Sequence, residues 1–268
     1  ELGFAGIAVG SAMNGCRPIV EYMTFNFSLV GIDQIINNAA KMRQMSAGQF
    51  PMPMVFRGPT GSAGQLAQQH SQNFENWYAN TPGLKVVVPS NPADAKGLLI
   101  SSIFDPDPVL FVEPMLMYWD PQYACDVPVG DNRIPLGKAN IVREGKDVTV
   151  ISYGKQVHDA VKAADILAGE GVSVEVIDLR TLVPLDEATV LASVSKTKRA
   201  VVVHEAVTRC GFGAELSSRI HEELFGTLAA PVARVGGQNT PVPYAKNLET
   251  AFVPQVADIV AAIKSLNK

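Results

Sequence analysis

One histidine in the sequence lies in a setting that suits proton transfer. His70 falls within residues 68–72 (Gln-Gln-His-Ser-Gln), a run of uncharged polar residues just beyond a stretch rich in glycine. A histidine titrates near neutral pH, and such a polar cluster at the mouth of a parallel sheet suits a site that handles a proton. His70 is therefore a candidate acid–base residue, and a purely structural hydrogen-bonding role is the alternative.

A short aromatic stretch forms a second candidate. Tyr22, Phe25 and Phe27 flank Asn26 where a predicted strand meets a predicted helix. Aromatic residues at this spacing usually pack in a core, but they can also stack on a flat heterocycle. Glu1 precedes a helix pattern rich in Gly and Ala, where a carboxylate meets the helix N-terminus; a solvated end residue is the alternative.

Two glycine-rich stretches look like nucleotide motifs but depart from them. Residues 58–64 lack the Lys-Ser/Thr ending of a phosphate-binding loop, which excludes a nucleoside triphosphate site of that type. Residues 211–216 have Leu216 where a dinucleotide fingerprint has its third glycine, so tight helix packing is the better interpretation. His204, which ends a predicted strand, is interpreted as a capping or interface residue, with catalysis as the alternative.

Strand and helix patterns alternate along the whole chain and predict an α/β fold. Strands are expected at residues 17–22, 52–56, 85–88, 109–112, 139–142, 148–152, 172–177, 200–204 and 231–235. Helices are expected at residues 2–14, 27–45, 92–104 (with Asn91 as its cap), 157–168, 186–197, 213–224 and 256–265, and a loop at 57–64. Such alternation predicts doubly wound, mostly parallel sheets. A proline-rich segment at 117–135 indicates a linker, so we expect two domains, residues 1–130 and 131–268.

Composition limits the classes of function. Hydrophobic residues make up 47% and charged residues 18% of the 268 residues, which supports a large core. The net charge of −4 with scattered basic residues argues against nucleic acid or a membrane surface as the main partner. The three cysteines are too few and too far apart for a disulfide framework or a zinc site. Because helix-forming residues begin directly at Glu1, we expect the first domain to continue upstream.

Several stretches together resemble one family, the beta subunits of the decarboxylating component of pyruvate dehydrogenase, within the transketolase-like 2-oxo acid dehydrogenases. The matching stretches run in order along essentially the whole chain. They are residues 1–10 (ELGFAGIAVG), 21–27 (EYMTFNF), 56–59 (FRGP), 69–72 (QHSQ), 82–87 (PGLKVV), 94–98 (DAKGL), 176–181 (VIDLRT) and 241–245 (PVPYA).

The resemblance implies a fold, a cofactor and partners. It implies a pyrimidine-binding domain followed by a transketolase-type C-terminal domain. It also implies thiamine diphosphate bound between this chain and an alpha subunit that holds the diphosphate and its Mg²⁺. The expected assembly has two alpha and two beta subunits. Its C-terminal beta domain docks a dihydrolipoyl acetyltransferase core. No acidic-glycine motif for a metal diphosphate is found in this sequence.

Roles for site residues also come from the resemblance. Glu1 matches the glutamate that hydrogen-bonds the aminopyrimidine ring and favours the tautomer that takes the thiazolium proton. Such a carboxyl group works best when it is buried and its pKa is raised. Phe27 matches the aromatic residue that stacks on the pyrimidine, with Met23 nearby. His70 matches the histidine that assists the substrate and the acyl transfer.

A structural monovalent cation, K⁺ by the resemblance, is expected at a second place. The matching positions are Met54, Ser102, Ile103, Asp105 and Asp107. Family members often carry Asn at the last position, but an aspartate can still reach a hard cation through oxygen. An ordinary turn at residues 104–108 is the alternative interpretation.

The predicted function is therefore that of an oxidoreductase subunit that acts on pyruvate and passes an acetyl group to a lipoyl arm. Two alternatives stay open. The first keeps the chemistry but uses branched-chain 2-oxo acids or acetoin; the second makes the chain mainly an assembly and docking subunit. The expected location is the bacterial cytoplasm or the mitochondrial matrix.

Overall fold

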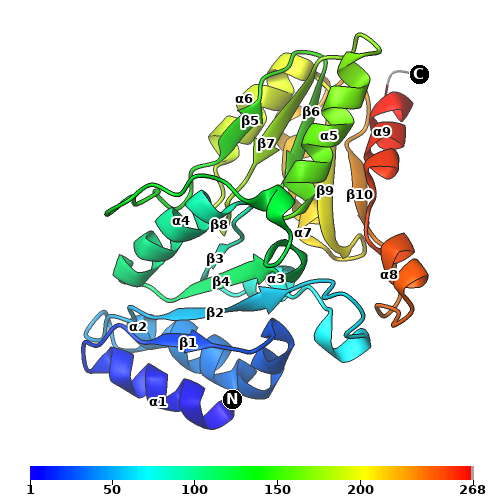
Figure 1. Cartoon of the computed structure of the whole chain (residues 1–268). Coiled ribbons are helices and arrows are strands. Elements are labelled where there is room, and N and C mark those ends of the chain that lie inside the picture. The colour runs from blue at the N-terminus through cyan, green and yellow to red at the C-terminus, as the bar shows by residue number, and fades with distance from the viewer. Residues whose placement is uncertain (267–268) are drawn as a thin grey trace.

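The computed structural model describes residues 1–266 and contains two five-stranded sheets, one in each half of the molecule (Figure 1). The first sheet has the order β1 (Ile19–Glu21), β2 (Val55–Thr60), β4 (Val109–Pro114), β3 (Lys85–Val87), β8 (Thr181–Val183). The second has the order β10 (Ala233–Gly237), β9 (Ala200–Val207), β6 (Val148–Ser152), β7 (Val174–Asp178), β5 (Asn140–Arg143). In the described chain, β8 and β5 pair antiparallel and the other strands pair parallel. The predicted α/β class with two mostly parallel sheets is confirmed.

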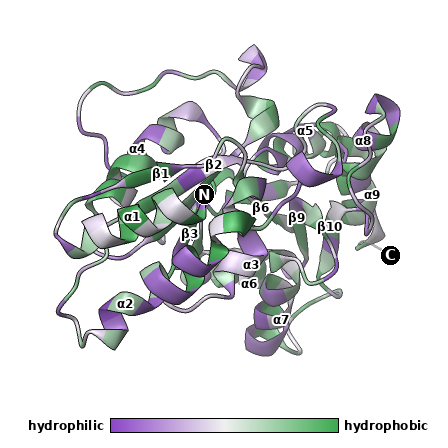
Figure 2. Ribbon diagram, turned by 90° about the horizontal axis from the view of Figure 1, so that it is seen from below, coloured by the Kyte–Doolittle hydropathy of each residue, from purple (hydrophilic) through white to green (hydrophobic). Residues whose placement is uncertain are grey.

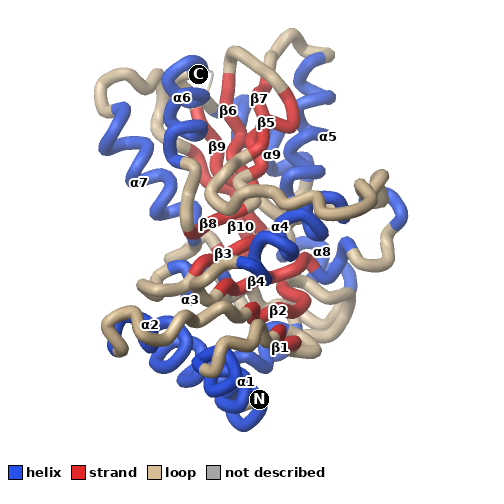
Figure 3. Tube along the Cα trace, turned by 90° about the vertical axis from the view of Figure 1, so that its left-hand side faces the viewer, coloured by secondary structure: helices blue, strands red, loops and turns tan. Residues whose placement is uncertain are grey.

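Helices pack on the sheets, and the largest hydrophobic core runs through both halves of the chain. The α-helices are α1 (Leu2–Met13), α2 (Ala40–Met45), α3 (Glu75–Ala79), α4 (Pro92–Phe104), α5 (Gln156–Ala168), α6 (Glu187–Thr197), α7 (Phe212–Leu224), α8 (Lys246–Phe252) and α9 (Val256–Ser265). Helix α4 covers one face of the first sheet, where Leu98 packs on Val55 and Phe111. Residues of α1 share a core with the opposite face of that sheet. In Figure 3, α1 and α2 lie beside the first sheet, and α5, α6 and α7 surround the second.

Local signals for helix starts explain why some bounds were predictable. The Asn91 side chain accepts a hydrogen bond from the backbone N–H of Asp94, and Pro92 is the first residue of α4. This is the predicted cap, and it satisfies a donor that the helix itself leaves open. Helix α9 begins with a reciprocal capping box between Gln255 and Asp258.

Two local expectations were wrong, and three short elements were missed. Residues 27–45, expected as one helix, form a 3₁₀ segment η1 (Phe25–Gly31), a π-helical segment η2 (Gln34–Ala39) and then α2. The loop expected from residue 57 begins later, because β2 pairs with β4 as far as Thr60. The short elements β8, α3 and α8 were not foreseen.

The two sheets are joined through contacts between segments that are distant in sequence. Strand β8 follows β7 of the second sheet along the chain but pairs with β3 of the first. The guanidinium of Arg180 binds the Asp94 carboxylate through two hydrogen bonds of 2.8 and 2.7 Å. Residues 117–135 are irregular apart from short 3₁₀ turns. A domain boundary after residue 130 stays a prediction. No helix of residues 1–266 is both long and apolar enough to cross a membrane.

Candidate functional site

The predicted pyrimidine-site residues lie near the carboxyl edge of the first sheet. Met23 follows β1, and His70 lies in a short 3₁₀ turn, η3 (Gln68–His70), that follows β2. Strands β1 and β2 are parallel neighbours, so their carboxyl ends lie side by side. Open parallel sheets bind ligands at this edge because loops from neighbouring strands converge there.

Phe27 and His70 are in direct contact. Their ring centroids are 5.3 Å apart with an interplanar angle of 83°, an edge-to-face arrangement. Asn26 ties the two loops together, because its Oδ1 accepts hydrogen bonds from the backbone and side-chain amides of Gln72, both at 3.2 Å. The polar neighbours of His70 in the sequence thus help to position its loop against η1.

Glu1 begins beside the same aromatic stretch. A Cβ added to Gly31 would lie 3.1 Å from both the Glu1 carbonyl oxygen and the Tyr22 hydroxyl, so a glycine permits this close approach. The Tyr22 hydroxyl is buried and has no hydrogen-bond partner among residues 1–266. Burial raises the pKa of Tyr22, and the charges of Tyr78 and Glu1 raise it further. Tyr22 was assigned no role from the sequence, and its orphaned hydroxyl is visible only in the fold.

The surface around Glu1 is apolar and open. Glu1 is exposed, Phe27 and His70 are half-buried, and Met23 is 77% exposed. Further exposed apolar side chains on α1 are Leu2, Phe4 and Ile7. Figure 2 shows α1 mostly in green and pale shades, whereas α7 is largely purple. The burial that we expected for the Glu1 carboxylate is therefore not provided by residues 1–266.

The residues expected to hold a monovalent cation lie together, but other groups contact their oxygens. The Arg17 guanidinium donates hydrogen bonds to the carbonyl oxygens of Ile103 (2.7 Å) and Asp105 (3.3 Å). The Asp105 carboxylate accepts from Lys85, with both oxygens at 2.7 Å. The Asp107 carboxylate pairs with Arg43.

Two of the expected cation ligands in this region are backbone carbonyl oxygens. The carbonyl oxygen of Met54 accepts the Val109 N–H at 2.9 Å, and that of Ser102 accepts the Asp105 N–H at 3.3 Å. A carbonyl oxygen has two lone pairs, so these atoms keep capacity for a cation. The side-chain oxygens of Asp105 and Asp107, in contrast, are already neutralised by basic residues.

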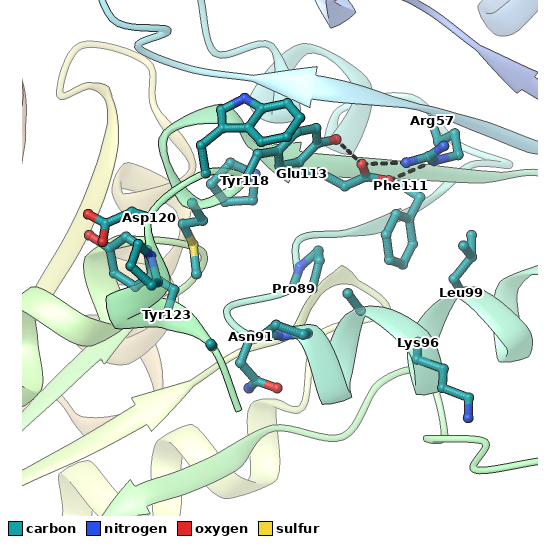
Figure 4. Close-up of a pocket in the computed structure, with 17 residues that line it drawn as sticks. Arg57, Pro89, Asn91, Lys96, Leu99, Phe111, Glu113, Tyr118, Asp120 and Tyr123 are labelled. Carbon is teal, nitrogen blue, oxygen red and sulfur yellow. Dashed lines mark hydrogen bonds and ion pairs between the residues drawn. The ribbon is translucent and has the colours of Figure 1, made fainter. Parts of the chain in front are cut away.

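A separate recess of about 550 Å³ lies on the α4 side of the first sheet (Figure 4). Arg57 crosses its wall and donates two hydrogen bonds of 2.7 Å to Glu113, which also accepts one from the Tyr118 hydroxyl. Arg57 donates a third to Glu21. Arg57 lies in residues 56–59, one of the stretches that match the family, but no role was assigned to it from the sequence. Its charge is balanced by two carboxylates, so the recess offers mainly apolar contacts.

The glycines at 211 and 213 pack against the His204 ring, in agreement with the helix packing interpreted for residues 211–216, whereas His204, interpreted as a capping or interface residue, is fully buried. A Cβ on Gly213 would lie 2.6 Å from the His204 Nε2, and one on Gly211 would lie 2.8 Å from its ring. The His204 Nδ1 lies 2.9 Å from the Ala206 carbonyl oxygen. Burial lowers the pKa of His204 to about 4, so its ring stays neutral at pH 7.

Comparison with known proteins identifies the family. The transketolase pyrimidine-binding domain matches residues 1–119, and the transketolase C-terminal domain matches residues 137–259. The "Pyruvate dehydrogenase E1 component subunit beta-2, mitochondrial" of Oryza sativa subsp. japonica is 54% identical over 98% of this chain and 70% of its own length. The human mitochondrial E1 beta subunit is 51% identical over 98% of this chain and 74% of its own. The chain belongs to the pyruvate dehydrogenase E1 beta-subunit family.

Membership confirms the resemblance found in the sequence and supports the predicted beta-subunit function. A bacterial member, the E1 beta subunit of Rhizobium meliloti (strain 1021), is 49% identical over 99% of this chain and 57% of its own length. The family thus includes mitochondrial and bacterial proteins, the two settings that we expected. A solved structure named "Split gene transketolase, inactive beta4 tetramer" has a TM-score of 0.78, covers 99% of this chain and 80% of its own, and is 21% identical. That likeness confirms the fold.

The residues at the open edge fit the pyrimidine half of thiamine diphosphate, whose binding the matched domain implies. The edge combines a carboxylate (Glu1), an aromatic face (Phe27) and a flexible apolar side chain (Met23), which suit a flat heterocycle with ring nitrogens. Among residues 1–266 no group of three or more His, Cys, Asp or Glu side chains is arranged to hold a metal ion. Membership of the beta-subunit family implies an E1 alpha partner.

Proposed function

We propose that this chain, with its alpha partner, decarboxylates pyruvate and passes the acetyl group to the lipoyl arm of a dihydrolipoyl acetyltransferase. The observation that carries the proposal is the contact of Phe27 with His70 at the open carboxyl edge of the first sheet, with the Glu1 backbone close to Tyr22 and Gly31. The relatives named above are E1 beta subunits of pyruvate dehydrogenase, which supports pyruvate over branched-chain 2-oxo acids or acetoin.

Each residue at the edge has one task. Bound thiamine diphosphate supplies the electron sink for loss of carbon dioxide. The Glu1 carboxyl group shares a proton with the ring nitrogen of the aminopyrimidine. Phe27 and Met23 pack on the ring and fix its orientation. His70, held edge-to-face by Phe27, lies where it can exchange a proton with the substrate or with the accepting lipoyl group.

The alpha subunit supplies the burial that Glu1 lacks. The exposed apolar side chains of α1 around Glu1 suit contact with another chain. Covering this surface would desolvate the Glu1 carboxyl group, which favours proton sharing over full ionisation. We propose that the alpha chain also provides the Mg²⁺–diphosphate half of the site, in an assembly of two alpha and two beta chains.

A structural K⁺ at Met54, Ser102, Ile103, Asp105 and Asp107 remains part of the proposal, as does docking of the acyltransferase core on the C-terminal domain. The paired side chains of Asp105 and Asp107 indicate that any K⁺ here would bind mainly through carbonyl oxygens. Asp107→Asn should then leave K⁺ binding intact.

The direct test is Glu1→Gln in the full-length chain assembled with alpha. Glutamine keeps the shape but cannot give up or take a proton, so turnover should fall by about 100-fold or more with assembly unchanged. Glu170→Gln, in an exposed ion pair with Lys264, is the matched control and should keep full turnover. Full activity of Glu1→Gln would reject the catalytic role and favour the docking alternative.

Substrate choice needs its own assay. The assembled complex should turn over pyruvate with a higher kcat/KM than 3-methyl-2-oxobutanoate or acetoin. A preference for the branched-chain acid would keep the edge chemistry and overturn the proposed substrate.

A further inference from the structure

A small cavity lies where the carboxyl ends of both sheets face each other. Its volume is about 20 Å³. Polar side chains from the first half of the chain line one side of it: Thr60, Asn73 and Glu75. Polar side chains from the second half line the other: Tyr153, Lys155, Gln156 and Glu205. The cavity is separate from the Phe27–His70 edge and from the loop at residues 102–107.

Two of the side chains that line the cavity have unsatisfied polar atoms. Glu75 is 2% exposed, and its Oε1 accepts a hydrogen bond of 3.0 Å from the Tyr153 hydroxyl. Its Oε2 has no partner within residues 1–266. Gln156 is 1% exposed, and neither its Oε1 nor its Nε2 has a partner in the same described range. Buried polar atoms normally have hydrogen-bond partners. Three such atoms without partners beside one cavity therefore indicate a missing ligand.

The charges around the cavity are unbalanced. Glu75 and Glu205 are both buried, and Asp159 lies close by. Lys155 is the basic residue that lines the cavity, and its Nζ lies 2.6 Å from Asp159 Oδ2. One oxygen of Glu205 is used by the Ser62 N–H. The N-terminus of α5 adds only partial positive charge. With all three carboxylates ionised, more negative than positive charge is buried here.

We propose that this cavity binds one monovalent cation of the size of K⁺, held by Glu75 Oε2 and Gln156 Oε1 together with neighbouring oxygens. The volume suits one sphere of the size of a water molecule, which K⁺ resembles. Carboxylate and amide oxygens are the donors that hard cations prefer. The two carboxylates that line the cavity, without a third acid or a histidine, suit a single positive charge better than a divalent metal site.

The ion would lock the two halves of the molecule together. Its donors come from α3 of the first half and from the start of α5 in the second. Burial raises the pKa of Glu75 to about 7 and also raises that of Glu205. A cation held by Glu75 and Gln156 in this cavity, which Glu205 also lines, would lower both values and let both carboxylates remain ionised.

Anomalous diffraction with thallium(I), a K⁺ substitute, tests the site in crystals of the full alpha–beta assembly. Crystals are grown without K⁺ and soaked in thallium(I) nitrate in chloride-free buffer. We expect an anomalous peak between Glu75 and Gln156. Density for a water molecule alone, with no anomalous signal there at saturating thallium, would overturn the proposal. The position of the peak separates this site from any ion at residues 102–107.

A variant tests the same site in solution. The Tm of the wild-type assembly should rise when K⁺ replaces choline at equal ionic strength. Glu75→Gln should lose the part of that rise that comes from the cavity, whereas Glu170→Gln should keep all of it. An unchanged K⁺ response in Glu75→Gln would contradict the proposal. Should this variant fail to assemble, the thallium experiment on the wild-type protein still decides.

Discussion

The carboxyl edges of the two sheets have opposite surroundings. At the first sheet, the part of the edge beside β1 and β2 is open, with Met23 exposed and Phe27 and His70 half-buried. At the second sheet, Tyr153 and Glu205 are buried against the first half of the molecule. The same kind of edge therefore serves two purposes. One is open, and we propose that it takes a cofactor and a second chain; the other joins the two halves.

The largest expected effect concerns the joining contacts. Asp94→Ala leaves the Arg180 guanidinium, only 17% exposed, without its carboxylate. Breaking such a buried pair costs about 3–5 kcal/mol of unfolding free energy. Denaturant unfolding should show this loss, whereas Asp131→Ala, in an exposed pair with Arg133, should change stability by less than about 0.5 kcal/mol. Equal effects would mean that the halves are not held together by this contact.

At the open edge the effect should fall on turnover and not on stability. His70→Gln should lower kcat by about 100-fold, since a general acid–base residue contributes at least that much. The Tm should stay near that of the wild type, because His70 is only half-buried. His221→Gln, on α7 of the second half, should keep full turnover. A large fall in Tm with normal kcat would assign His70 a structural role.

The buried junction should also make stability depend on pH. Burial raises the pKa of Asp178 from 3.8 to about 7, so the folded state binds a proton that the unfolded state releases. The stability that this proton contributes is complete below pH 3.8 and is lost as the pH rises through 7. Between pH 5 and pH 8, the unfolding free energy of the wild type should therefore fall by about 2 kcal/mol more than that of Asp178→Asn. Identical pH profiles would exclude this account of Asp178.

The smallest expected effect concerns association with the alpha chain. A Cβ on Gly3 would meet nothing within 4 Å in this chain, although Gly3 lies beside Glu1 on the apolar helix α1. Gly3→Leu should leave the isolated chain folded but weaken alpha binding by about 10-fold, by blocking close approach of the partner. Sedimentation or calorimetry would measure this. Unchanged affinity would place the alpha contact elsewhere.

Local patterns made much of the fold predictable. The strand at 148–152 and the helix at 256–265 were predicted with the observed bounds, because their patterns and caps act within a few residues. Residues 27–45 have helical spacing, but 3₁₀ and π turns replace a regular helix before α2. Residue 57 looked like a loop start, yet pairing with β4 extends β2.

The site was predictable only in part, for a physical reason. Motif stretches singled out Glu1, Phe27 and His70, and the fold places Phe27 on His70 and Glu1 beside the same aromatic stretch. The contact of Glu75 with Tyr153 joins residues far apart in sequence, and no local period encodes such a pair. Nor does the sequence show that Glu1 is exposed within residues 1–266.

The central claim is that the open edge holds the aminopyrimidine of thiamine diphosphate. A crystal structure of the full-length chain assembled with alpha and the cofactor tests it most directly. The account predicts that the Glu1 carboxyl group lies within hydrogen-bonding distance of a pyrimidine ring nitrogen and that Phe27 packs on the ring face. A pyrimidine ring bound elsewhere, for example in the recess beside Arg57 under α4, would contradict it.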